Sequence, residues 1–126
     1  MVPVKLKPKG TGLDRNADEK PSIARAIILA LPSRLKKEKA ANISGIYHFD
    51  ISGPNGGKYS VMLDAGNCEI LEGFHGEAKC LTEVEDTVYE GIELGKSNPQ
   101  EALMTGKLKV SNIMEMMTFG GLFKKL

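Results

Sequence analysis

The side chains that could carry acid–base or nucleophilic chemistry are few and scattered along the sequence. His48 and His75 are the only two histidines, and neither has a serine or cysteine at a spacing that predicts an activated nucleophile. His48 alternates with the apolar residues of a predicted strand, and His75 lies in a turn flanked by glycines. This pattern favours two surface histidines over a general acid or base.

The two cysteines, Cys68 and Cys80, fall on strands that the sequence predicts to be neighbours. They could approach each other, but small buried thiols are the more common outcome than a disulfide or a metal site. Two cysteines cannot build a disulfide framework, which makes a reducing compartment the expected one. We therefore expect no metal, no cofactor and a cytoplasmic location.

Acidic residues and one glycine-lysine pair are the remaining candidates for chemistry. The acidic residues of the predicted helix after residue 84 indicate a solvated face and no paired acid and base. Gly95-Lys96-Ser97 is similar to the end of a phosphate-binding loop, but the first glycine of that motif would stand at position 90, which is Glu90. The tripeptide also ends a helix instead of beginning one. We therefore expect no catalytic activity.

Length and composition predict one globular domain. The chain has 126 residues, of which 41% are hydrophobic and 26% charged, so disorder throughout, collagen and coiled coil are poor descriptions. Seventeen basic residues oppose sixteen acidic ones, which does not favour nucleic acid as a partner. No apolar run reaches the roughly 18 residues of a membrane span, and no secretory signal is expected at the N-terminus.

Charge is balanced in total but not along the chain. Residues 1–40 carry ten basic and four acidic side chains, residues 41–95 two and ten, and residues 96–126 five and two. The simpler interpretation is that the basic ends fold back and complement the acidic centre. The alternative is that the ends share a face that meets anionic lipid or an acidic partner.

The first part of the chain is predicted as an arm followed by a broken helix. Residues 1–20 alternate lysine with apolar residues and contain prolines and glycines, which favours a flexible N-terminal arm before a domain at 21–126. Residues 21–31 carry isoleucine and leucine at helical spacing. Pro32 is expected to stop or bend this helix, and Ser33 is expected to cap a second piece over 34–41.

The centre of the chain is predicted to form a meander of four consecutive strands. Four segments alternate in polarity and are separated by glycine-rich turns, at residues 45–52, 58–63, 68–72 and 78–84. Helices are predicted over 84–95 and 99–105, then a fifth strand over 108–110 and a last helix over 113–125. The last helix has too many apolar residues for one buried stripe, so it either lies deep in the fold or covers something apolar.

From Gly45 onward the sequence resembles the sterol-carrier-protein family, a lipid-transfer domain. The motifs that carry the resemblance are Tyr47-x-Phe49-Asp50-Ile51-Ser52-Gly53, Gly57-Lys58-Tyr59-x-Val61, Asp86-x-x-Tyr89-x-x-Ile92-x-x-Gly95-Lys96-x-Asn98-Pro99 and Gly106-Lys107-Leu108-Lys109-Val110. Two positions depart from the family pattern. Asn112 stands where glycine is usual, and Thr82 stands where an inward aliphatic residue is usual, which makes the interior more polar.

The resemblance implies an α+β fold with a five-stranded, largely antiparallel sheet, helices packed on one face and an apolar tunnel between them. The implied function is non-catalytic binding and transfer or presentation of a fatty acid, fatty acyl-CoA, phospholipid or sterol. The alternative is a protein-interaction or accessory module that uses the same fold with a filled core. The residues expected to contact lipid are Ile27, Leu31, Phe49, Ile51, Val61, Tyr89, Ile92, Leu103, Met104, Ile113, Met116, Met117, Phe119 and Phe123.

Methionine content agrees with a lipid partner. Four of the six methionines fall between residues 104 and 117, and methionine adapts to irregular apolar shapes, although the same residues could simply be core. A lipid is the expected ligand, and a membrane surface or a partner enzyme would be a further partner. Lys124-Lys125-Leu126 matches a peroxisomal targeting tripeptide only in its last two residues, so a peroxisomal location is not assigned.

Overall fold

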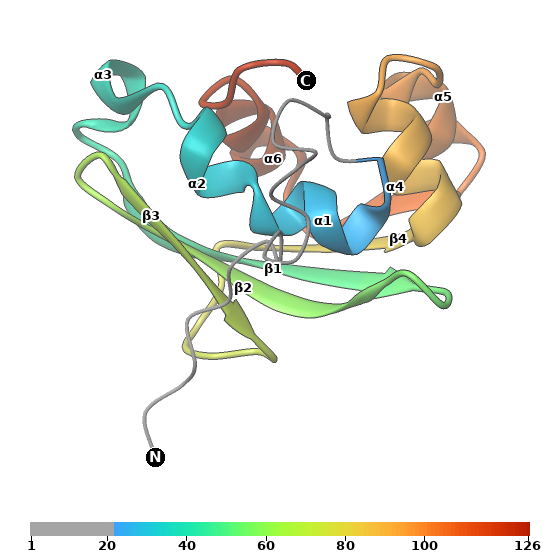
Figure 1. Cartoon of the computed structure of the whole chain (residues 1–126), viewed down its shortest axis with the longest axis horizontal. Coiled ribbons are helices and arrows are strands. Elements are labelled where there is room, and N and C mark those ends of the chain that lie inside the picture. Colours follow the sequence, from blue (N-terminus) through green and yellow to red (C-terminus); the bar gives the residue numbers. More distant parts are fainter. Residues whose placement is uncertain (1–21) are drawn as a thin grey trace, which may run out of the picture.

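The computed structural model describes residues 22–126, which form a five-stranded sheet with helices on one face (Figure 1). The elements in chain order are α1 (Ala24–Leu29), α2 (Leu31–Arg34), α3 (Lys37–Ala40), β1 (Ser44–Ser52), β2 (Gly57–Asp64), β3 (Asn67–Glu72), β4 (Cys80–Glu85), α4 (Asp86–Glu93), α5 (Pro99–Met104), β5 (Leu108–Val110) and α6 (Ile113–Gly120). The α+β class and the largely antiparallel sheet are confirmed. The arm expected over residues 1–20 lies outside the described residues.

The strand order corrects the predicted meander. The sheet runs β3-β2-β1-β4-β5, and β4 pairs in parallel with β1 instead of following β3 at the edge. The chain between β3 and β4 crosses the outer face of the sheet, where the Ser60 hydroxyl donates to the Gly73 carbonyl (2.7 Å) and the Lys79 amide donates to the Ile46 carbonyl (2.8 Å). Two strands therefore separate the cysteines that were predicted to be neighbours.

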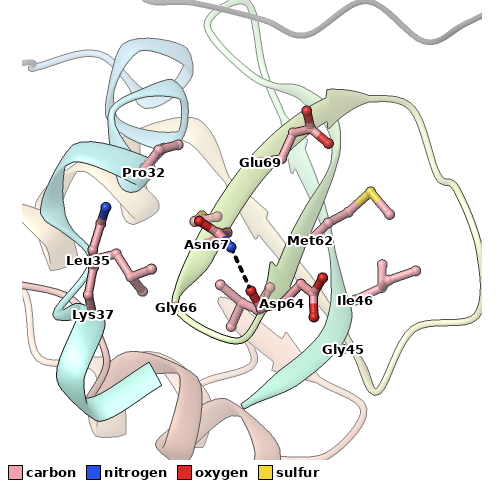
Figure 2. A pocket seen from close by; sticks show the side chains of 12 residues that line it. Pro32, Leu35, Lys37, Gly45, Ile46, Met62, Asp64, Gly66, Asn67 and Glu69 are labelled. Atoms are coloured by element: carbon pink, nitrogen blue, oxygen red, sulfur yellow. Dashed lines mark hydrogen bonds between the residues drawn. The ribbon is translucent and has the colours of Figure 1, made fainter. Parts of the chain in front are cut away.

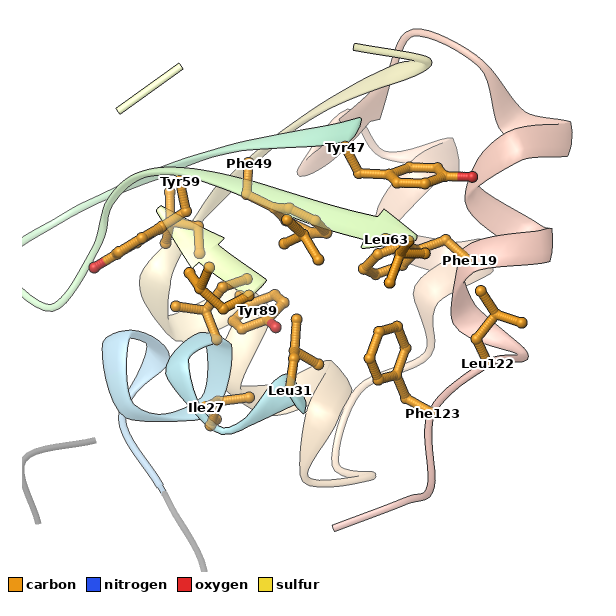
Figure 3. Close-up of a cluster of buried hydrophobic side chains, with 14 of the residues drawn as sticks. Ile27, Leu31, Tyr47, Phe49, Tyr59, Leu63, Tyr89, Phe119, Leu122 and Phe123 are labelled. Carbon is orange, nitrogen blue, oxygen red and sulfur yellow. The ribbon is translucent and has the colours of Figure 1, made fainter. Parts of the chain in front are cut away.

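The inner face of the sheet is apolar because alternate side chains of each strand point toward the helices. Tyr47, Phe49 and Ile51 of β1 are buried there, and the first two lie opposite the buried Val61 and Tyr59 of β2. We call the interior between sheet and helices the apolar layer (Figure 3). Its buried members are Ala24, Ile27, Ile28, Leu31, Leu35, Ala40, Tyr47, Phe49, Ile51, Tyr59, Val61, Leu63, Ile70, Cys80, Val84, Tyr89, Phe119, Leu122 and Phe123.

The first helical segment is broken as Pro32 predicts. Helix α1 ends at Leu29, and Pro32 occupies the first turn of α2, where its missing N–H costs nothing. The capping role predicted for Ser33 is wrong. Its hydroxyl instead donates to the Ala30 carbonyl (2.7 Å), and α3 begins only after Lys36. Residues 35 and 36 are extended, so the second helical piece, predicted over residues 34–41, is shorter and spans only Lys37–Ala40.

Asp86 fixes the junction between the sheet and α4. Its carboxylate accepts the backbone N–H groups of Asn55 (2.9 Å) and Thr87 (2.7 Å), and the residue is only 3% exposed. Gly53, with φ +100°, passes so close that a Cβ there would meet this carboxylate at 2.5 Å. Asp86, the first residue of the motif that ends in Asn98-Pro99, thus holds the β1–β2 turn against the start of α4.

The C-terminal segment is not helical to its end. Helix α6 ends at Gly120, and the chain then runs extended beside the α2–α3 connection. The Lys36 amide donates to the Leu122 carbonyl (2.7 Å), and the Lys124 amide donates to the Arg34 carbonyl (2.8 Å). We call this pairing the C-terminal clasp. Within residues 22–126, no helix has the length and apolar character needed to cross a membrane.

Candidate functional site

Phe119 of α6 lies at the centre of an aromatic group in the apolar layer (Figure 3). Its ring centroid is 4.7 Å from that of Tyr47, 5.4 Å from that of Phe49 and 4.9 Å from that of Phe123. Phe49 in turn lies 6.2 Å from Tyr89, edge to face. These spacings are those of favourable aromatic pairs. The rings from β1, α4, α6 and the C-terminal segment therefore form one continuous apolar surface.

The structure places most of the predicted lipid-contacting residues in this layer. Those fully buried in it are Ile27, Leu31, Phe49, Ile51, Val61, Tyr89, Phe119 and Phe123. Met116 is partly buried against the layer, and Ile92 and Leu103 are half-buried elsewhere. Met104, Ile113 and Met117 face outward, with 87%, 54% and 69% of their surface exposed. Contact of these residues with lipid stays a prediction.

Side chains occupy the space where the resemblance implies a tunnel. Phe119 and Phe123, each less than a tenth exposed, fill the layer beneath the C-terminal segment. A ligand in the layer would have to displace some of these side chains. The tunnel itself thus stays a prediction. A ligand would enter the layer most easily beneath a helix that can move away from the sheet.

Helix α6 covers the aromatic group and is held by few buried side chains. Among its eight residues only Phe119 is buried. Two hydrogen bonds support it: the Asn112 side chain accepts the Glu115 amide (3.1 Å), and the Tyr47 hydroxyl donates to Glu115 Oε1 (2.9 Å). Burial, and then the hydrogen bond to Glu115, raises the pKa of Tyr47. Local opening favours elements with few buried contacts, and α6 is such an element directly over the aromatic group.

Two polar atoms in or beside the layer have no hydrogen-bond partner within residues 22–126: Thr82 Oγ1 and Arg34 Nη1. Burial first, and the nearby charge of Glu93 next, raises the pKa of Tyr89 well above its usual value, while Arg34 opposes this shift. An unpaired buried polar group costs roughly 1–3 kcal/mol. These groups could therefore receive a polar atom of a ligand. Thr82 was identified from the sequence as a polar departure, but nothing in the sequence pointed to Arg34.

Arg34 joins α2 to α4 and to the C-terminal clasp. Its Nη2 pairs with Glu93 Oε1 (3.1 Å), and its Nε donates to the Lys124 carbonyl (2.8 Å). The side chain of Arg34 is 12% exposed and that of Glu93 is 21% exposed. One guanidinium therefore holds three separate segments together at the edge of the layer.

A groove of about 620 Å³ lies between the α2–α3 segment, the start of β1 and the β2–β3 hairpin (Figure 2). This volume is within the range of ligand pockets. Leu35 and Leu63 belong to both the groove and the apolar layer, so the groove borders the layer. The lining residues are Pro32, Leu35, Lys37, Gly45, Ile46, Met62, Leu63, Asp64, Gly66, Asn67, Cys68 and Glu69. None of the fourteen predicted lipid-contacting residues lines it, because sequence periodicity does not report a hollow.

The two histidines hold a loop on the outer face of the sheet. His48 donates from Nε2 to the His75 carbonyl (3.0 Å), and its ring stacks on Phe74 with centroids 4.5 Å apart. His75 donates from Nε2 to the Glu72 carbonyl (2.8 Å). Both side chains are half-buried. They therefore fix the β3–β4 connection, on the opposite side of the sheet from the apolar layer.

Comparison with protein families gives one match. The model of the SCP-2 sterol transfer family matches residues 26–124. A search of curated proteins gave no significant match. The matched range contains all six helices apart from the first two residues of α1, and all five strands.

Solved structures with the same fold include sterol carrier proteins. Sterol Carrier Protein 2 from Yarrowia lipolytica, in its apo form, is 26% identical with a TM-score of 0.58, covering 82% of this chain and 92% of that one. The sterol carrier protein domain 2 of Helicoverpa armigera is 25% identical with a TM-score of 0.54, covering 69% and 72%.

A larger enzyme contains the same fold. The stereoselective inverting sec-alkylsulfatase Pisa1 from Pseudomonas sp. is 15% identical with a TM-score of 0.71 over 88% of this chain. The chain spans only 17% of the length of that alkylsulfatase. This likeness concerns the fold alone.

Proposed function

Since the chain belongs to the SCP-2 sterol transfer family, a family of lipid binding and transfer, we propose that it carries a lipid whose apolar part lies in the apolar layer beneath α6. The proposed ligand is a fatty acid, fatty acyl-CoA, phospholipid or sterol. The proposed role is transfer or presentation of that lipid from a cytoplasmic location, without catalysis.

The observation that carries this proposal is that α6 covers the aromatic group with a single buried side chain. Removing the packing of one phenylalanine costs about 3–5 kcal/mol. A sixteen-carbon chain that enters the layer gains about 12 kcal/mol gross, at roughly 0.8 kcal/mol per methylene. Association and ordering oppose this gain by about 4–15 kcal/mol. The balance predicts modest affinity, which suits a carrier that must also release its ligand.

A non-catalytic role fits the chemistry of the described residues. Both histidines donate to backbone carbonyls on the outer face of the sheet, away from the apolar layer. Among residues 22–126, the unpaired groups in or beside the layer are the Thr82 hydroxyl and one guanidinium nitrogen of Arg34. These groups can orient a polar head, and the carboxylate of Glu93 beside them is engaged as the ion-pair partner of Arg34 (3.1 Å). We expect no turnover of the bound lipid.

The filled layer also favours a second candidate, an interaction module that uses the fold without a ligand. In that case the aromatic group would be an ordinary core, and α6 would stay closed. The two candidates differ in one measurable property, which is whether a lipid occupies the protein.

The test is native mass spectrometry of the freshly purified protein, followed by denaturing extraction and lipid identification. We expect an adduct that is lost on denaturation, and faster hydrogen exchange in α6 when the ligand is present. A protein that stays without adduct after incubation with fatty acid, acyl-CoA, phospholipid and sterol would support the interaction module instead.

The location of the ligand needs a separate measurement, because the groove also borders the layer. A photoreactive fatty acid should label residues beneath α6, such as Phe123, if the proposal is correct. Labels confined to Met62 and Cys68 would place the ligand in the groove, and α6 would then not be the moving cover.

A further inference from the structure

Thr82 is a polar residue that points into the apolar layer. It lies on β4 between Cys80 and Val84, and the alternation of the strand puts all three side chains on the inner face of the sheet. Thr82 is 3% exposed, so its hydroxyl group is removed from solvent. Its Oγ1 has no hydrogen-bond partner within residues 22–126. A hydroxyl group therefore stands unpaired inside an interior that is otherwise apolar.

Two neighbouring polar groups on the same face of the sheet do have partners. The Tyr47 hydroxyl donates to Glu115 Oε1 (2.9 Å), and the Cys80 thiol donates to the Asn112 carbonyl (3.5 Å). Both acceptors belong to α6 or to the residue that caps it. Thr82 lies two residues beyond Cys80, where no described residue supplies such a partner. An oxygen atom of a ligand would complete the hydrogen bonding of Thr82.

The register of the sheet places Thr82 beside the aromatic group that α6 covers. On β1 the residue opposite Thr82 is Phe49, whose ring centroid lies 5.4 Å from that of Phe119. On β5 the residue opposite is Val110, which packs against the apolar layer. Helix α6 itself packs against β4. A lipid chain that takes the place of Phe119 would therefore run close to the Thr82 hydroxyl.

The surroundings of Thr82 select the kind of oxygen that can pair with it. A hydroxyl group both donates and accepts hydrogen bonds, so one neutral hydroxyl of a ligand would satisfy Thr82 and be satisfied by it. An ionised carboxylate or phosphate would lose its hydration at this depth. The inner-face residues that flank Thr82 on β1, β4 and β5 are uncharged and offer it no compensation. The matching group is therefore a neutral one.

A flexible chain suits this place better than a rigid ring system. Side chains fill the layer, and Phe119 is the one buried side chain that α6 contributes. Withdrawal of Phe119 would open space for a few methylene groups, which an acyl chain can use by threading between the remaining side chains. A body of fused rings would have to displace close-packed side chains of the sheet and of several helices at once.

We propose that Thr82 is a specificity-determining residue for acyl chains that carry a hydroxyl group along the chain, with which Oγ1 forms a hydrogen bond beneath α6. This inference rests on the proposed function, because it needs a lipid in the apolar layer. The charged end of such a lipid stays outside the layer, and the chain hydroxyl pairs inside it. A chain without the hydroxyl still binds through its apolar surface but leaves Thr82 unpaired.

Displacement of a fluorescent fatty acid tests this selectivity. The competitors are stearic acid and a set of stearic acids that each carry one hydroxyl group at a different carbon. The wild type should bind one member of the set about tenfold more tightly than the others, because only a hydroxyl that meets Thr82 is paired. Thr82→Val keeps the shape of the side chain without its hydroxyl. It should lose this preference while binding stearic acid at least as tightly as the wild type.

Thr118→Val is the matched control, because it makes the same substitution at an exposed position of α6. It should keep the preference of the wild type. Equal binding of all hydroxylated chains by the wild type, or a preference that Thr82→Val retains, would overturn the inference. Stearic acid would still bind in both cases, so the proposed function would stand. Failure of every fatty acid to bind the wild type would instead contradict the proposed function and this inference with it.

Urea unfolding without ligand checks the unpaired state of the hydroxyl. Because Thr82→Val removes a buried group that has no partner, its unfolding midpoint should be at least as high as that of the wild type. A midpoint clearly below that of the wild type would show that the hydroxyl has a partner in the folded protein. In that case Thr82 is not available to a ligand, and the inference is wrong.

Discussion

Replacing Phe119 by alanine should destabilise the protein and at the same time improve lipid binding. The ring is 5% exposed and contacts three other aromatic rings, so its removal should cost about 3–5 kcal/mol of the free energy of unfolding, near the upper end of that range. The cavity left behind lies in the apolar layer. About four methylene groups of an acyl chain could fill it and regain roughly 3 kcal/mol, or about a hundredfold in affinity.

The assay has two readouts, urea unfolding for stability and displacement of a fluorescent fatty acid for affinity. Leu71→Ala is the matched control. Leu71 is 7% exposed but lies outside the apolar layer, opposite Ser60 of β2 on the outer face of the sheet. Its removal should cost about 2–5 kcal/mol without any gain in affinity.

The reasoning is refuted if Phe119→Ala binds fatty acid no more tightly than the wild type, even though it is less stable. It is also refuted if Leu71→Ala gains as much affinity. In the first case the ligand does not use the space beneath α6, and in the second the gain comes from a generally loosened fold.

Three further predictions concern stability and reactivity. Asp86→Ala should lower the free energy of unfolding, measured in urea, by about 2–4 kcal/mol, because the N–H groups of Asn55 and Thr87 lose their acceptor. An effect below about 0.5 kcal/mol would contradict the role of Asp86 in holding the β1–β2 turn against α4. Burial raises the pKa of all three tyrosines, so the folded protein retains phenol protons that the unfolded chain releases. The free energy of unfolding should therefore be constant up to about pH 9 with respect to these groups and fall above about pH 10. Tyr47→Phe should reduce the slope of the free energy of unfolding against pH in this range by the equivalent of about one proton. An unchanged slope would argue against a raised pKa of Tyr47 in the folded protein. Burial, with the charge of Glu69 second, raises the pKa of Cys68 to about 12. Its reaction with a thiol reagent at about pH 8 should be at least tenfold slower in the folded protein than in urea, and equal rates would contradict this.

Strand positions could be predicted from the sequence because alternation reports which face a side chain occupies. Tyr47, Phe49 and Ile51 alternate with polar residues, and all three are buried in the apolar layer. Alternation does not report which strand is the neighbour, so the parallel pairing of β1 with β4 was missed. That pairing depends on the path of the β3–β4 loop over the outer face, which Ser60 stabilises.

The burial of the predicted lipid-contacting residues could be predicted from the sequence only in part. Phe119 and Met117 are both apolar residues of one helix, and hydrophobic periodicity cannot tell a buried apolar face from an exposed one. The structure buries Phe119 and leaves Met117 69% exposed. The role of Arg34 was missed because its partners, Glu93 and Lys124, lie 59 and 90 residues away in the sequence.

The C-terminal clasp has a consequence for the time course of folding. Since the segments that it joins are separated by about 90 residues, closing it is a non-local step with a large loop-closure cost, and such steps come late in folding. A chain made on the ribosome from its N-terminus has no clasp until residue 124 has emerged. Until then the sheet and α1 can form while the aromatic surface of β1 lacks Phe119 above it. A nascent chain therefore presents an open apolar surface, and a lipid that reaches it at this stage displaces no side chain.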